Sequence, residues 1–88
     1  MPANQPTYLE RLLRFPAGAS AHLIARELAD ANGVTVPALR SASRREPLPE
    51  VRRLVARKAH RLGVTQAHIA AALNVHPSRV SRLIGGAV

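Results

Sequence analysis

The chain has 88 residues, a formal net charge of +8 and no cysteine. That length fits one small domain, and the lack of cysteine excludes disulfide bonds, cysteine-ligated zinc sites and thiol nucleophiles. No apolar run approaches the roughly 20 residues of a membrane span, and the first residues lack the pattern of a signal peptide, so we expect a cytoplasmic protein.

The first third of the chain predicts a tail followed by two helices. Residues 1–6 contain two prolines and little that could be buried, which indicates a flexible N-terminal tail before a single helical domain. Thr7 can cap a short helix whose apolar face lies within residues 8–15. Ser20 can cap a second helix, which Asn32-Gly33 would end.

The middle of the chain predicts a short helix and then the longest helix of the fold. Pro37 suits the first turn of the short helix, from which Leu39 points inward. After the basic loop "SRREPLP", the long helix runs from about residue 49 to 62 and is closed by Gly63. Its inner stripe is apolar at helical spacing: Val51, Val55, Ala59 and Leu62. Its outer face is basic: Arg52, Arg53, Arg57 and Arg61.

Residues 65–84, "TQAHIAAALNVHPSRVSRLI", have the spacing of a helix-turn-helix. Thr65 can cap the first helix, Asn74 tolerates a left-handed backbone in the turn, and Pro77 suits the start of the second helix. The positions expected to pack the crossing are small or apolar: Ala70, Val75, Val80 and Leu83. The second helix of such a unit can enter the major groove of DNA, although an ordinary helical hairpin has the same pattern.

The excess of positive over negative charge lies entirely in the second half of the chain. Residues 1–39 hold three basic and three acidic residues, whereas residues 40–88 hold ten basic and two acidic residues. This segregation suggests a polyanionic partner. A compositional bias toward alanine and arginine, with a merely solvated basic face, is the alternative, but it does not explain the segregation.

From about residue 20 to 84 the chain resembles the C-terminal DNA-binding domain of the bacterial replication initiator DnaA, which has a Trp-repressor-like fold. The similar elements are "ANGVTVPALRS", the basic loop "SRREP", the long helix "EVRRLVARKAHRLG" and the helix-turn-helix, in the same order. The resemblance covers about three quarters of the chain. It implies an all-α small helical bundle that binds duplex DNA.

The chain departs from that family at its signature. The initiator's Gly-Gly-Arg-Asp-His-Thr-Thr-Val reads here as "ALNVHPSRV", and His76-Pro77 replaces the base-reading Asp-His pair. This departure argues against recognition of the initiator's own DNA box. The family's ATPase region and its glycine-rich phosphate loop are not among these residues, so we do not expect initiator activity from them.

The pattern and the resemblance together assign roles to polar residues. Base contacts are expected from the second helix of the helix-turn-helix: His76, Ser78, Arg79 and Arg82. Contacts with the DNA backbone or the minor groove are expected elsewhere: Arg44, Arg45, Arg52, Arg53, Arg57, Lys58 and Gln66. The family's minor-groove arginine corresponds to Arg52 or Arg53, and the alignment does not choose between them.

These expectations describe a double-stranded DNA-binding protein associated with the nucleoid, a regulator of transcription or replication and not an enzyme. No cofactor or metal site is expected, because the four histidines are dispersed and no His-x-x-x-His pair occurs. Two alternatives stay open. The chain could be an adaptor that keeps the fold but binds a replication or transcription protein, and the helix near residues 8–15 could form a homodimer.

Overall fold

In the computed structural model, the described residues are 17–85, and they form five helices and no strand. The helices are α2 (Ala17–Ala31), α3 (Val36–Leu39), α4 (Leu48–Arg61), α5 (Gln66–Leu73) and α6 (Pro77–Gly85). The predicted all-α class is confirmed over this range. The predicted tail at 1–6, the helix near residues 8–15 and any dimer surface on that helix lie outside the described residues. No helix within the described range is both long and apolar enough to cross a membrane.

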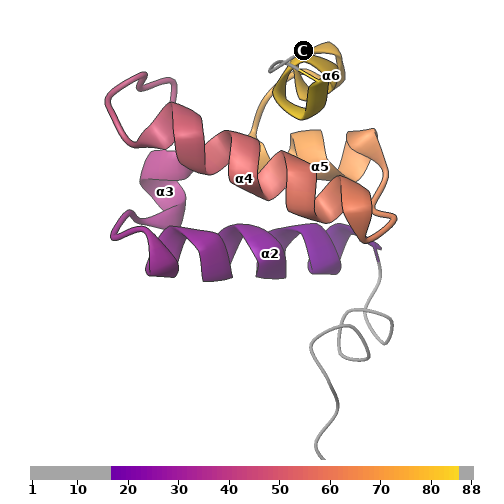
Figure 1. Cartoon of the computed structure of the whole chain (residues 1–88), viewed down its shortest axis with the longest axis horizontal. Coiled ribbons are helices and arrows are strands. Elements are labelled where there is room, and N and C mark those ends of the chain that lie inside the picture. Colours follow the sequence, from indigo (N-terminus) through magenta and orange to yellow (C-terminus); the bar gives the residue numbers. More distant parts are fainter. Residues whose placement is uncertain (1–16, 86–88) are drawn as a thin grey trace, which may run out of the picture.

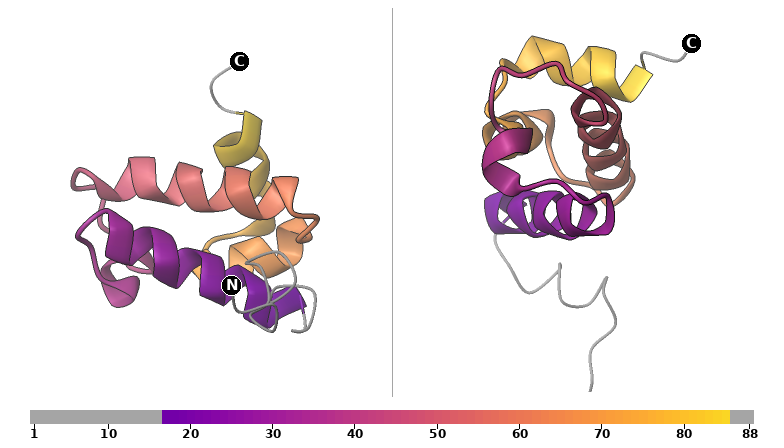
Figure 2. Two further views of the ribbon diagram at one scale, coloured as in Figure 1. Left: turned by 60° about the horizontal axis from the view of Figure 1, so that its bottom comes forward. Right: turned by 90° about the vertical axis from the view of Figure 1, so that its left-hand side faces the viewer.

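The helices pack around α4 and α5, which lie between α2 on one side of the molecule and α6 on the other (Figures 1 and 2). Helix α2 packs on α4 and α5, and α6 packs on the same two helices from the opposite side. The short α3 bridges α2 and α4. Helix α6 therefore has an outer face that no other described helix covers.

Each of the five helices contributes to one apolar core. The largest fully buried side chains come from all of them: Ile24, Leu39, Val51, Val55, Ile69, Leu73 and Val80. Alanines fill the remaining positions and let the helices approach closely: Ala21, Ala25, Ala29, Ala56, Ala59, Ala70 and Ala72. The predicted inner stripe of α4 is confirmed, with Leu62 at its end only partly buried.

Three helices end in the same kind of joint, at residues 33–35, 63–65 and 74–76. In each joint a residue with positive φ stops the helix, at 69° for Gly33, 86° for Gly63 and 56° for Asn74. The valine that follows donates its N–H to the carbonyl of an alanine five residues earlier, at 2.9–3.0 Å. The third residue caps the next helix with its side chain: Thr35, Thr65 and His76. One short pattern thus reverses the chain three times.

Three details differ from the sequence-based predictions. Ser20 does not cap a helix, because α2 already begins at Ala17 and Ser20 is buried inside it. Helix α4, with 14 residues, is one residue shorter than α2 and is not the longest. Arg52 does not lie on the outer face of α4 but is 4% exposed. The helix limits around α5 and α6, with Thr65 as cap, Asn74 in the turn and Pro77 at the start of α6, are confirmed.

Replacing Asn74 tests the joint between α5 and α6. Asn74 has a left-handed backbone, and its side-chain amide donates to the Arg40 carbonyl at 3.2 Å. Asn74→Ala should lower the free energy of unfolding by about 1–2 kcal/mol, because it loses the hydrogen bond and strains the backbone. Asn74→Gly should cost less, because glycine adopts positive φ without strain. Urea denaturation measures both, and an alanine variant as stable as the glycine variant would contradict this account.

Candidate nucleic-acid interface

The loop of residues 40–47, between α3 and α4, carries two of the predicted phosphate contacts, Arg44 and Arg45. The hydroxyl groups of its serines form hydrogen bonds with backbone groups of the loop and of α3. Ser41 Oγ donates to the Ala38 carbonyl at 2.6 Å and accepts from the Ser43 N–H, and Ser43 Oγ accepts from the Arg45 N–H. Local hydrogen bonds therefore hold the first half of the loop, next to α3, in a defined conformation.

The Arg52 guanidinium fastens this loop to α4. Its Nε donates to the Leu39 carbonyl at 2.9 Å, its Nη1 to the Ser43 carbonyl at 2.7 Å, and its Nη2 to the Ser41 carbonyl at 2.8 Å, with a longer Nη2 contact to Ala38. The planar fork of an arginine suits such convergent acceptors. Arg52 thus holds the loop that carries Arg44 and does not itself offer these donors to a partner.

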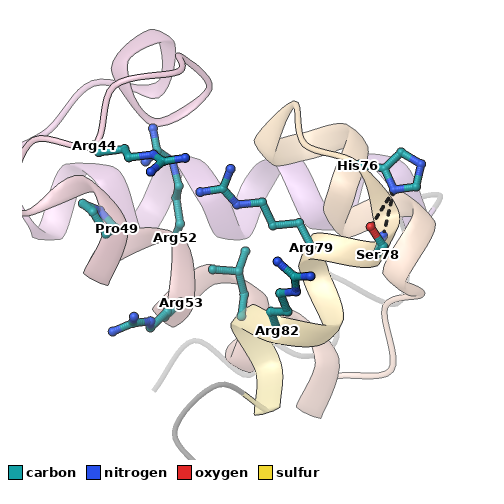
Figure 3. Close-up of a pocket in the computed structure, with 9 residues that line it drawn as sticks. Arg44, Pro49, Arg52, Arg53, His76, Ser78, Arg79 and Arg82 are labelled. Carbon is teal, nitrogen blue, oxygen red and sulfur yellow. Dashed lines mark hydrogen bonds between the residues drawn. The ribbon is translucent and has the colours of Figure 1, made fainter.

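The carbonyl acceptors stabilise the positive charge of Arg52, whereas the rest of its surroundings destabilise that charge. Burial lowers the pKa of Arg52, and the positive charge of Arg79 lowers the pKa further. Arg79 of α6 lines the same groove as Arg52 (Figure 3), although the two residues lie 27 positions apart in the sequence. Residues that the sequence separates are therefore brought to one site.

Helix α6 has hydrogen bonds at its start and at its middle and presents polar side chains outward. His76 Nδ1 accepts the Ser78 N–H at 3.1 Å and lies 2.8 Å from Ser78 Oγ. Ser81 Oγ donates to Gln66 Oε1 at 3.0 Å, which ties α6 to the start of α5. Val80 is fully buried beneath the helix. The side chains predicted to face DNA from α6 are exposed: Ser78, Arg79 and Arg82.

A groove of about 790 Å³ lies between α6, the start of α4 and the 40–47 loop (Figure 3). We call it the cationic groove, because five arginines line it: Arg44, Arg52, Arg53, Arg79 and Arg82. The other lining residues are Pro49, His76, Ser78 and Leu83. No acidic side chain is among the described residues that line it. Arg53 also forms a weak ion pair with Glu50 at 3.5 Å on the exposed surface.

The predicted site residues divide into two groups. The cationic groove brings together all four predicted base-contacting residues, His76, Ser78, Arg79 and Arg82, with Arg44 and Arg53. Four predicted contacts do not line it: Arg45, Arg57, Lys58 and Gln66. Arg45 is exposed beside Arg44 in the loop, Arg57 and Lys58 are half-buried on α4, and the Gln66 amide oxygen is engaged by Ser81.

Sequence reasoning missed two lining residues and one structural role. Pro49 and Leu83 line the cationic groove, where they supply apolar walls. The helical spacing of Leu83 indicated the core, and it is half-buried at the boundary between core and groove. The loop-holding role of Arg52 has no sequence signal beyond its place at the start of α4, because its acceptors are backbone carbonyls from 9 to 14 residues away.

Comparison of the chain with protein-family models, curated proteins and solved structures finds no significant match. Within residues 17–85, no cluster of three or more histidine, aspartate or glutamate side chains could hold a metal ion. Guanidinium groups donate to oxyanions in fixed geometry, so what this arrangement can do is bind an anionic partner.

Replacing Arg52 tests whether it holds the loop. Arg52→Met keeps the apolar stem but removes the N–H groups that donate to the loop carbonyls. The free energy of unfolding should therefore fall by about 2–4 kcal/mol. Arg53→Met is the matched control, because Arg53 is exposed and its ion pair with Glu50 is weak; it should change stability by less than about 0.5 kcal/mol. Urea denaturation of both variants decides, and equal stability would show that Arg52 does not hold the loop.

Proposed function

We propose that this protein binds double-stranded DNA through a helix-turn-helix made of α5 and α6, in a Trp-repressor-like arrangement similar to the C-terminal domain of DnaA. The observation that carries the proposal is the cationic groove, which lies beside the exposed face of α6 and contains no acidic lining residue within the described range. A duplex supplies the repeated anionic charge that such a surface favours.

The dimensions and position of α6 suit the major groove. A helix with its side chains is about 10–12 Å across, close to the width of about 12 Å of the major groove. Helix α6 lies at the outside of the molecule, opposite α2 (Figure 2). Helix α2 carries one arginine against Glu27 and Asp30, so the side facing away from the duplex has no positive excess among its Lys, Arg, Asp and Glu residues.

Different residues around α6 would contact the bases, the phosphates and the minor groove. His76, which caps α6, and Ser78 and Arg82 within it are exposed and would read base edges. A bidentate arginine–guanine pair contributes about 1–3 kcal/mol of discrimination. Arg44 and Arg45 would contact phosphates from the loop. Arg53 would take the minor-groove position, since it is exposed at the start of α4 whereas Arg52 is buried.

A protein that binds duplex DNA in this way, without a catalytic centre, would act as a regulator of transcription or replication. The adaptor alternative rests on the loss of the Asp-His pair, which His76-Pro77 replaces, and on apolar residues near the N-terminus, which lie outside the described residues. The duplex-binding experiment distinguishes the adaptor from a DNA-binding protein.

Fluorescence anisotropy with duplexes selected from a random pool measures the proposed binding. Neutralising about four phosphates predicts a loss of affinity of about 100-fold between 50 and 200 mM salt. Arg82→Ala should reduce the preference for selected over unrelated duplexes by about 10-fold to 100-fold.

Arg26→Ala removes the same charge from the exposed surface of α2 and is the matched control, which should leave both affinity and preference unchanged. Absence of duplex binding at low salt would refute the proposal. A salt-resistant complex with a replication or transcription protein would then favour the adaptor.

A further inference from the structure

Three guanidinium groups from three different segments converge in the cationic groove. Arg44 comes from the loop, Arg52 from α4 and Arg79 from α6 (Figure 3). Figure 3 shows the Arg79 side chain extending from α6 toward Arg44 and Arg52, and away from His76 and Ser78. Like charges gathered in this way destabilise one another unless an anion lies among them.

The two outer arginines have donors to offer. Arg44 and Arg79 are exposed, and neither side chain has a hydrogen bond or ion pair with any residue in the range 17–85. Arg52 differs, because its Nε, Nη1 and Nη2 atoms already donate to backbone carbonyls. Arg52 therefore supplies a fixed positive charge at the base of the groove, while Arg44 and Arg79 supply free hydrogen-bond donors above it.

We propose that Arg44 and Arg79 clamp a single phosphate group over the fixed charge of Arg52. The unesterified oxygens of a phosphate lie on a tetrahedral centre, so two guanidinium forks can approach it from different segments, whereas both oxygens of a carboxylate lie in one plane. The phosphate can belong to a DNA backbone, in which case this inference rests on the proposed function, or to a free phosphorylated molecule.

This site changes the role of Arg79. Its place in the second helix of the helix-turn-helix predicted a base contact, but its side chain is directed to the loop and α4. Arg79 would instead fix the register of α6 against the duplex through the backbone. Sequence reading would then fall to His76, Ser78 and Arg82.

Thermal unfolding with inorganic pyrophosphate, compared with sodium chloride at the same ionic strength, tests the site without DNA. Pyrophosphate at about ten times its Kd should raise the Tm of the unaltered protein by about 8 °C. Arg44→Gln and Arg79→Gln should each lose most of this increase, measured from their own Tm in chloride. Arg61→Gln removes the same charge from an exposed position outside the groove and should keep the increase. An equal increase in all variants, or none in the unaltered protein, would overturn the proposal.

Duplex binding distinguishes the sources of the phosphate. If the site holds a backbone phosphate, Arg79→Gln should weaken binding to selected and unrelated duplexes alike, by about 10-fold, and reduce the salt slope by about one. Loss of sequence preference at an unchanged salt slope would overturn the phosphate role while leaving DNA binding intact. An Arg79-dependent increase in Tm without any duplex binding would refute the proposed function and assign the site to a free phosphorylated molecule.

Discussion

The hydrogen bonds from the Arg52 guanidinium to the carbonyls of residues 38–43 determine where the positive charge of this protein lies. A loop with two serines and three arginines buries no apolar side chain between residues 40 and 47, because Ala42 and Pro47 are both exposed. Arg52 ties the loop to α4, because its donors reach Leu39, Ser41 and Ser43 from the start of that helix. Arg44 is consequently held beside α6, and the cationic groove exists as a defined concave surface.

This arrangement concentrates charge at a cost in stability. Five arginines share one groove without an acidic lining residue, and one of them is buried. A small core of alanine, valine, leucine and isoleucine side chains has to offset that repulsion. An anionic partner would relieve it, so the same charges that weaken the free fold would strengthen the complex.

The sequence predicted what is decided locally and failed where distant segments meet. Thr65, Asn74 and Pro77 act through their own backbone neighbours, so the limits of α5 and α6 could be read from residue types. The burial of Arg52 depends on backbone carbonyls of residues 39–43, which only the tertiary fold places next to it. The helical periodicity of the sequence contains no information about these carbonyls. The choice of Arg44 over Arg45 as a groove residue likewise depends on the loop backbone. One further signal is local: "GVT" occurs twice in the sequence, and both copies are helix joints.

An NMR titration of the labelled protein with a duplex selected from a random pool tests the central claim most directly, because it reports every backbone amide at once. The account predicts that the largest chemical-shift changes fall in the 40–47 loop, at the start of α4 and along residues 76–82, while the amides of α2 stay unchanged. Changes concentrated on α2, with the loop and α6 unaffected, would contradict it and place the interaction surface on the opposite side of the molecule.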